Sequence, residues 1–406
     1  MMAPDDAWGL VLKQTRPLAD GPQPLAQALG FCLAEAIHAD RDLPPANRAA
    51  MDGYAVQAAA LSPSPVTLRV IGETAAGHPA GPAVRPGACV RVFTGANLPP
   101  GADAVVRQED TEPADDRGES VRLLTAVPPG AHVFQQGENA RQGAELLTPG
   151  ARLDAAALAL CAAVGRSVVR VVRRPSVGLL TTGSELLAAA AAAQPHQIRD
   201  SNGPFLRAAL AEHGYAVAAD ARVDDDPDRI VAALRDLAAC SDVIVLTGGV
   251  SVGRYDFTAE AVRRAGATVR FHGVAMKPGK PLLHAVAPAG RLIFGLPGNP
   301  LSAMVCFYEF VLPALNLLAG WPAARSRPVA TVRLAHDLAV KGERQQHVPA
   351  WLSWTPTGPE AAAVAVRGTA DVVAAARADG ALVVPAGTRA VPAGTYLAFR
   401  PWRTPW

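Results

Sequence analysis

Lysine is scarce in this chain of 406 residues: it occurs four times, and arginine supplies almost all other positive charge. Two of the four lysines lie in one short loop, MKPGKP at residues 276–281, among proline and glycine. A lysine ammonium is a compact, strongly hydrated point charge, whereas an arginine guanidinium is a planar fork. Two lysines retained in this rigid loop, called the lysine loop below, indicate a site that grips a small anion.

Other features are also absent, and each absence excludes a class of protein. The net charge is only +2, and no basic tract suggests nucleic-acid binding. No uninterrupted apolar run approaches the length of a membrane span, and the first ten residues are acidic where a secretory signal is basic. Five scattered cysteines without a Cys-x-x-Cys pair indicate buried thiols, not disulfides or a zinc site. We therefore expect a cytoplasmic protein that binds neither nucleic acid nor membrane.

The chain is too long for one hydrophobic core, so two to four domains are expected. The first part, to about residue 41, looks helical at residues 7–12 and 25–39. Short β-type runs separated by turns follow and indicate a small β domain. We expect strands there at residues 66–71, 89–93, 104–107 and 121–124, and then a helix at 154–164 and a β run at 168–172.

Between residues 175 and 318, strands and helices alternate, which favours a parallel sheet covered by helices on both faces. Past residue 320 the β pattern returns and predicts a second barrel-like unit. In the alternating part we expect strands at residues 177–180, 215–218, 243–246 and 292–296, and helices at 203–213, 228–239, 257–265 and from 300 onward. In the last part we expect strands at 329–334, 351–354, 364–366, 381–384 and 396–399.

Three loops of the alternating part carry polar and glycine residues where a strand ends. They are TTGSE at residues 181–185, TGGVS at 247–251 and PGNP at 297–300. Ligands of open parallel sheets bind at this edge, and glycine loops and helix N-termini favour phosphates or other oxyanions. The phosphate motifs G-x-x-x-x-G-K-[ST] and G-x-G-x-x-G are absent, which argues against an ATPase P-loop and a Rossmann dinucleotide site.

Three carboxylates, Glu185, Asp225 and Asp256, each follow a predicted strand. Carboxylates beside lysines and phosphate-type loops suit a Mg²⁺ that bridges to substrate phosphates. Taken singly, each could instead cap a helix, and the run DDD at residues 224–226 before Pro227 fits that interpretation well. Together with the lysine loop, the metal site is the interpretation we favour.

Seven motifs occur in an order that is typical of one protein family. They are AMDGYAV at 50–56, FTGA at 93–96, GADAVV at 101–106, TGSEL at 182–186, TGGVSVG at 247–253, KPGKP at 277–281 and LPGNP at 296–300. On these motifs, nearly the full chain resembles the molybdopterin molybdenumtransferases, which include bacterial MoeA and the E domain of gephyrin.

The resemblance implies a multidomain α/β plus β fold: a central parallel-sheet domain flanked by helices, two smaller β domains and a mixed N-terminal domain. It also implies a homodimer, with molybdopterin adenylyltransferase and molybdoenzyme apoproteins as further candidate partners. The implied domains are residues 1–45 with 138–172 (mixed), 46–137 (inserted β), 173–322 (molybdopterin-binding α/β) and 323–406 (C-terminal barrel-like).

The implied reaction inserts molybdate into adenylyl-molybdopterin and releases AMP, with Mg²⁺ present. Lys277, Lys280 and Ser251 would hold molybdate. Glu185, Asp225 and Asp256 would bind the metal, and both aspartates would also act in catalysis. Asp52, as a catalytic residue, and Thr94, as a substrate-binding residue, would reach the partner subunit's cleft. The other implied substrate-binding residues are Thr182, Gly183, Glu185, Asp200, Asn202, Thr247, Gly248, Gly249, Pro297, Gly298, Asn299 and Pro300.

The chain departs from the family pattern at several positions. Ala49 replaces a serine, Asn139 an aspartate and Gly273 a lysine, and the basic residues expected before Asn139 are missing around Phe134. Two alternatives follow: a molybdopterin-binding scaffold with little turnover, which the departures favour, or a molybdopterin adenylyltransferase, against which the β domains count. The family's arginine and Gly-Ser positions are matched loosely by Arg344 and by the pair GT at 368–369.

Overall fold

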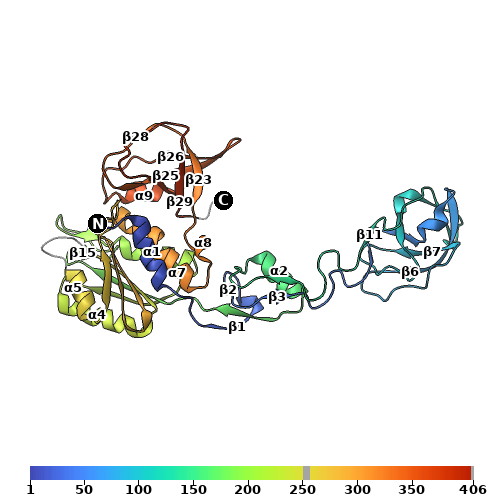
Figure 1. The fold of residues 1–406 in the computed structure, drawn as a ribbon, viewed down its shortest axis with the longest axis horizontal. Coiled ribbons are helices and arrows are strands. Elements are labelled where there is room, and N and C mark those ends of the chain that lie inside the picture. The colour runs from blue at the N-terminus through green and yellow to red at the C-terminus, as the bar shows by residue number, and fades with distance from the viewer. Residues whose placement is uncertain (250–256, 404–406) are drawn as a thin grey trace. The chain divides into compact units, whose positions relative to one another are not determined.

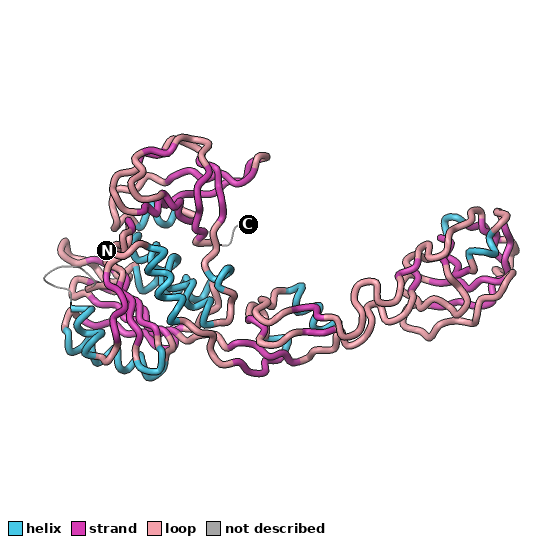
Figure 2. Tube along the Cα trace, viewed as in Figure 1, coloured by secondary structure: helices cyan, strands magenta, loops and turns pink. Residues whose placement is uncertain are grey.

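The computed structural model describes residues 1–249 and 257–403, and the chain divides into two compact units (Figures 1 and 2). The first unit comprises Met1–Ala34, Gly150–Asp154 and Val168–Trp406, and the second comprises Glu35–Pro149 and Ala155–Ser167. The finer four-domain boundaries stay predictions.

The centre of the first unit is a six-stranded sheet in the order β17-β14-β18-β22-β21-β19. The first four strands are parallel, as predicted, whereas β21 runs antiparallel to both of its neighbours, β22 and β19, so the sheet is mixed. A short turn, Pro288–Gly290, joins β21 to β22, and so short a connection can only link antiparallel neighbours. The strands are β14 Val177–Thr182, β17 Val217–Val223, β18 Val243–Thr247, β19 Thr268–His272, β21 Leu283–Val286 and β22 Leu292–Leu296.

Helices cover both faces of this sheet, as predicted (Figure 1). Because side chains alternate along a strand, Leu179 and Val245 pack toward one layer of helices and Leu180 and Ile244 toward the other. One layer holds α4 (Pro227–Cys240) and α5 (Phe257–Arg264), and the other holds α1 (Pro4–Gln14), α3 (Asn202–Glu212) and the helix at residues 300–318. Asp226 caps α4, because its carboxylate accepts the backbone N–H groups of Asp228 and Arg229.

The helix at residues 300–318 consists of α6 (Pro300–Cys306), a π-helical turn (Phe307–Val311) and α7 (Leu312–Leu318). A proline within a helix clashes with the carbonyl four residues earlier, so Pro313 explains the widened turn before it. The helix is long and apolar enough to cross a membrane, but 89% of the relevant window is buried inside the protein. It is therefore a core helix.

The C-terminal part of the first unit is a barrel-like sheet in the order β20-β25-β26-β23-β29-β27, closed by a β25–β27 pairing. The strand predicted at 364–366 is wrong: Val364 donates one hydrogen bond to the Pro349 carbonyl, but the pairing does not continue. Strand β20 is part of the lysine loop. The strands are β20 Met276–Lys277, β23 Ala330–Leu334, β25 Gln345–Thr355, β26 Gly358–Ala363, β27 Gly380–Val384 and β29 Tyr396–Pro401; α8 spans Ala323–Ser326 and α9 Val372–Arg377. A separate two-stranded pair joins β24 Leu338–Ala339 to β28 Ala390–Val391.

The helix predicted at residues 25–39 is wrong. Only a 3-10 turn, Leu25–Gln27, forms, and Gly30 then adopts a φ of +76°, which stops a helix. The following residues pair as strands instead: β2 joins a three-stranded sheet, and β3 joins a two-stranded one in the second unit. The strands are β1 Asp20–Pro24, β2 Cys32–Leu33, β13 Val168–Val172, β3 Ile37–His38 and β12 Glu145–Leu147.

The second unit contains the predicted β domain, a six-stranded sheet in the order β8-β5-β7-β6-β10-β9. Its strands are β5 Gly53–Val56, β6 Val66–Thr74, β7 Ala88–Val92, β8 Ala104–Arg107, β9 Thr111–Pro113 and β10 Ser120–Leu123, which confirms the four predicted runs. The predicted helix at 154–164 is α2, Ala155–Ala163. Strands β4 (Arg48–Ala49) and β11 (Val133–Phe134) pair beside this sheet.

Candidate functional site

A cavity of about 700 Å³ opens beyond the carboxyl ends of β14, β18 and β22. The three polar loops singled out in the sequence meet there, as expected for the edge of a parallel sheet. The cavity is lined by Thr181, Thr182, Glu185, Leu186, Ile198, Arg199, Asp200, Ser201, Asn202, Thr247, Gly248, Gly249, Pro281, Pro297, Gly298, Asn299, Pro300, Ala370 and Val372. Eleven of these were candidates from the sequence, and Gly183 lies between two of them.

The loop after β18 touches the end of β14 directly. Gly248 has a φ of +98°, and a side-chain Cβ there would come within 2.0 Å of the carbonyl oxygen of Thr182. Only glycine meets both demands, because a Cβ would clash and would also disfavour this backbone conformation. The two loops can therefore form one continuous wall of the cavity.

Asn202, at the start of α3, holds the loops together. Its side-chain amide donates to Thr247 Oγ1 at 2.9 Å and to the Gly298 carbonyl at 2.8 Å. The side-chain oxygen of Asn202, Oδ1, and the Thr182 hydroxyl are buried and have no hydrogen-bond partner among residues 1–249 and 257–403. Buried polar atoms rarely stay unpaired, so both are available to a ligand in the cavity that these residues line.

Two of the three candidate metal-binding carboxylates approach the same loops. Glu185 lines the cavity, and Asp225 Oδ1 lies 3.9 Å from the position that a Cβ on Gly249 would take. Within the described residues no group of three histidine, cysteine or acidic side chains gathers as a metal site. Asp256, the third candidate, and Ser251 lie outside the described residues. The donor set of carboxylate oxygens fits a hard cation such as Mg²⁺.

The lysine loop lies at the boundary between two cavities. Its Pro281 lines the first, whereas Lys277 lines a second cavity of about 560 Å³ together with Lys341, Arg367 and Thr369. Lys280 is exposed on the same loop. Three of the chain's four lysines thus lie in the loop or this cavity wall, although nothing in the sequence connects Lys341 with the other two.

Asn299 and Thr369 link the walls of the two cavities. The side-chain amide of Asn299 donates to Thr369 Oγ1 at 2.7 Å, and the two residues line the first and second cavity respectively. Asn299 occupies the N-cap position of α6, but its side chain makes this contact instead of a capping hydrogen bond.

Asp52 and Thr94 pair with each other in the second unit. The Thr94 backbone N–H and hydroxyl both donate to Asp52 Oδ1 at 2.7 Å. These two hydrogen bonds lower the pKa of the Asp52 carboxyl below its ordinary value.

Some lining residues were not expected from the sequence. Arg199, which forms β16 with Ile198 and pairs with β15 (Leu186–Leu187), directly precedes the candidate Asp200, so a charged neighbour was the available signal. Ala370 and Val372 come from the C-terminal part of the chain. They are small apolar residues about 70 positions away from the PGNP loop, and nothing in their sequence marks them.

Comparison with known proteins shows the family of the chain. Residues 2–165 match the family model "MoeA N-terminal region (domain I and II)", and residues 178–317 match "Probable molybdopterin binding domain". The chain is 35% identical over 327 residues to a molybdopterin molybdenumtransferase of Nostoc, covering 79% of this chain and 74% of that protein. It is 38% identical over 298 residues to one of Bacillus subtilis, covering 72% and 69%.

A solved structure agrees over the whole chain. The molybdopterin biosynthesis MoeA protein of Pyrococcus horikoshii superimposes with a TM-score of 0.80 at 30% identity, covering all of both chains. Two family models, relatives above 30% identity and a full-length structural match thus point the same way. The chain belongs to the MoeA family of molybdopterin molybdenumtransferases, and its function lies in molybdenum cofactor biosynthesis.

Proposed function

We propose that this chain inserts molybdate into adenylyl-molybdopterin and releases AMP. The observation that carries the proposal is the convergence of the three strand-end loops on one cavity of about 700 Å³, which Pro281 of the lysine loop also lines. Backbone N–H groups of the TGG and PGNP loops suit the diphosphate of the adenylylated substrate. The buried side-chain oxygen of Asn202 and the Thr182 hydroxyl would form hydrogen bonds with its polar groups.

The lysine loop would bind molybdate. Molybdate is a small tetrahedral dianion, so compact point charges such as Lys277 and Lys280 suit it better than a planar fork does. Lys277 lines one cavity, and Pro281 of the same loop lines the other, so an anion held by this loop lies beside the substrate.

Glu185 and Asp225, with Asp256, would hold a Mg²⁺, which when bound neutralises charge on the substrate phosphates. Asp225 and Asp256 also serve in catalysis by orienting the groups that react at the phosphoanhydride. In this proposal the protein is a cytoplasmic homodimer, and Asp52 and Thr94 act in the cleft of the partner subunit. The two hydrogen bonds from Thr94 hold the Asp52 carboxylate in one orientation for that role.

Release of AMP by the purified protein tests the proposal. With adenylyl-molybdopterin and Mg²⁺, AMP should appear only when molybdate is added, and Asp225→Ala should abolish its release. Asp224→Ala is the matched control, because this neighbouring carboxylate is exposed and pairs with Arg229 instead. Tight substrate binding without AMP release would overturn the proposal in favour of a scaffold.

A further inference from the structure

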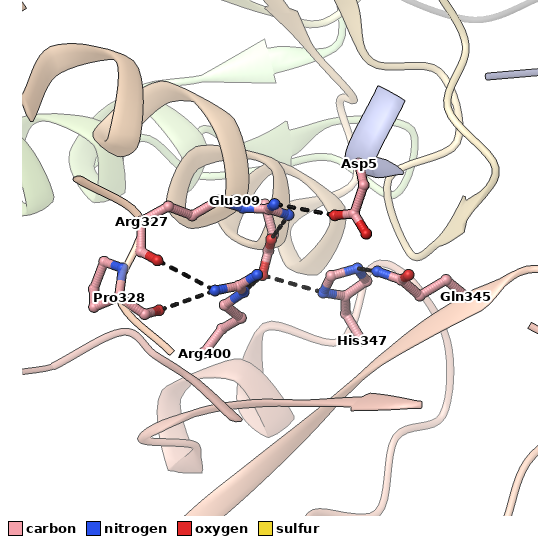
Figure 3. Close-up of polar contacts among 7 residues, drawn as sticks. All are labelled: Asp5, Glu309, Arg327, Pro328, Gln345, His347 and Arg400. Carbon is pink, nitrogen blue, oxygen red and sulfur yellow. Dashed lines mark hydrogen bonds and ion pairs between the residues drawn. The ribbon is translucent and has the colours of Figure 1, made fainter. Parts of the chain in front are cut away.

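A buried ionic cluster surrounds Glu309, which lies in the π-helical turn Phe307–Val311 (Figure 3). Glu309 is 1% exposed. Arg327 Nη2 donates to its Oε2 at 2.6 Å, and His347 Nδ1 and Arg400 Nε lie 3.3 and 3.4 Å from its Oε1. The widened turn thus carries a carboxylate that three other segments of the chain share.

The cluster is largely shielded from water. The side chain of His347 is fully buried, that of Arg327 is 8% exposed and that of Arg400 is 16% exposed. Burial alone would raise the pKa of Glu309, but His347 and the two guanidinium groups outweigh it and lower the pKa to about 2. Glu309 is therefore an anion, and its removal would leave two buried cations without their shared counter-charge.

This cluster joins the two parts of the fold that carry the candidate site. Glu309 belongs to the helix that begins at Pro300 in the PGNP loop. His347 belongs to β25, and this strand pairs in parallel with β20, which places Met276 opposite Gln345 and Lys277 opposite Gln346. The contact between Glu309 and His347 therefore connects the helix of one loop with the strand that carries the lysine of another.

Two contacts tighten the connection on the β25 side. Gln345 Nε2 lies 3.1 Å from His347 Nε2, so the same imidazole touches Glu309 with one nitrogen and the partner of Met276 with the other. Arg344, just before β25, donates to the Met276 carbonyl at 3.0 Å. The strand part of the lysine loop is thus held by β25.

The other end of the lysine loop rests on the helix itself. A Cβ on Gly279 would lie 2.8 Å from Cys306 Sγ, so the loop touches the helix three residues before Glu309. The lysine loop therefore contacts the helix at one end and β25 at the other. The contact between Glu309 and His347 sets the distance between the helix and β25.

We propose that Glu309 is a positioning residue for Lys277: through His347 and β25 it holds the lysine loop at a fixed place relative to the PGNP helix. That placement sets the affinity for molybdate, a consequence that rests on the proposed function. Glu309 itself touches no substrate. Its effect is transmitted through one imidazole and one pair of parallel strands.

Hydrogen–deuterium exchange tests the placement without any assay of activity. In Glu309→Gln, the amides of residues 274–282 should exchange roughly fivefold faster than in the wild type, because β20 loses its fixed partner. Asp5→Asn is the matched control: Asp5 also pairs with Arg327, at 3.3 Å, but its side chain is 83% exposed. It should leave exchange in residues 274–282 unchanged, and unchanged exchange in Glu309→Gln would overturn the proposal.

The concentration dependence of AMP release tests the consequence. Glu309→Gln should raise the KM for molybdate roughly tenfold and leave the KM for adenylyl-molybdopterin and kcat near the wild-type values. In a Lys277→Ala background, the same substitution should have no further effect on the molybdate KM. Equal effects in both backgrounds, or equal losses in both KM values, would show general destabilisation and overturn the proposal.

A second variant covers the case in which Glu309→Gln does not fold. His347→Gln removes the imidazole that connects Glu309 to β25 but leaves Glu309 with Arg327 and Arg400. It should accelerate exchange in residues 274–282 in the same way, and normal exchange there would contradict the proposal. If the wild type releases no AMP, the proposed function fails, while the exchange measurements still decide the role of Glu309.

Discussion

The strand-end loops and the lysine loop contribute to one candidate site, but different parts of the fold hold them. The TGG loop directly follows a strand of the central sheet and is fixed by the close contact between the backbones of Gly248 and Thr182. The lysine loop is fixed by a strand pairing with β25, about 70 residues later in the chain. A loop that continues from a buried strand needs little help, whereas one that bridges two layers depends on the contact between them.

The largest expected effect comes from disrupting the contact between the TGG loop and the end of β14. In Gly248→Ala, the Cβ would lie 2.0 Å from the Thr182 carbonyl oxygen, so one of the two loops must move. We expect AMP release to fall more than about 100-fold, because misplacement by about 1 Å has that effect. Gly266→Ala is the control: its φ is +93° but no atom lies within 4 Å, so it should reduce stability and leave AMP release intact. Similar activity losses in both variants would contradict the role of the close approach.

Acid should weaken the sheet before it affects the Glu309 cluster. Burial lowers the pKa of His284 in β21 from 6.5 to about 4, whereas Glu309 has a pKa of about 2. His284 is protonated in the unfolded chain below pH 6.5 but stays neutral in the folded protein down to about pH 4, so stability falls as the pH drops through this window. Between pH 7 and pH 5 its contribution should fall by about 2 kcal/mol.

Urea unfolding of wild type and His284→Gln at both pH values measures this contribution. The variant should lose about 2 kcal/mol less than the wild type between pH 7 and pH 5. The difference between pH values is the readout, because the substitution also changes the contact of His284 Nε2 with Gln14 Oε1. An equal loss in both proteins would place the acid-sensitive group elsewhere.

A smaller effect is expected from disrupting the contact between the lysine loop and the helix at residues 300–318. In Gly279→Ala the Cβ would lie 2.8 Å from Cys306 Sγ and 2.9 Å from Met276 Cε, at a φ of +106°. The methyl group would push the lysine loop off the helix, and we expect the molybdate KM to rise roughly tenfold, since displaced side chains modulate binding by this much. Adding Cys306→Ala should lower the KM again because it removes the clashing sulfur. No relief would mean that the contact with Met276 or the backbone strain, and not the Cys306 contact, causes the loss.

The smallest expected effect concerns the link between the two cavities. Thr369→Val keeps the side-chain shape but removes the hydroxyl that accepts from Asn299 Nδ2 at 2.7 Å. A single hydrogen bond contributes about 0.5–1.5 kcal/mol, so we expect a roughly two- to tenfold rise in the KM for adenylyl-molybdopterin. Thr357→Val, which removes a hydroxyl from an exposed turn of the same barrel, should change nothing. If both variants behave alike, the link has no role in binding.

Local sequence patterns predicted the strands and the helix of the central sheet that carry the strand-end loops. The buried strands β14, β18 and β22 and the helix α4, with Asp226 as its cap, lie where hydrophobic runs and capping residues indicated. Local patterns failed at residues 25–39, where apolar spacing suggested a helix but Gly30 and pairing with other strands decided otherwise. Such pairing involves partners more than a hundred residues away, which a local pattern does not contain.

The lysine loop shows the same division. By itself the sequence determined that two of four lysines lie in a rigid loop and that three polar loops each follow an apolar strand. It also determined that the motif order is typical of the MoeA family. Only the tertiary structure decided that Lys277 faces a second cavity with Lys341, and that Ala370 and Val372 close the first. The same holds for Glu309, which appears in the sequence as one acidic residue in an apolar helix. Its partners come from three distant segments, so its role follows from packing and not from any local pattern.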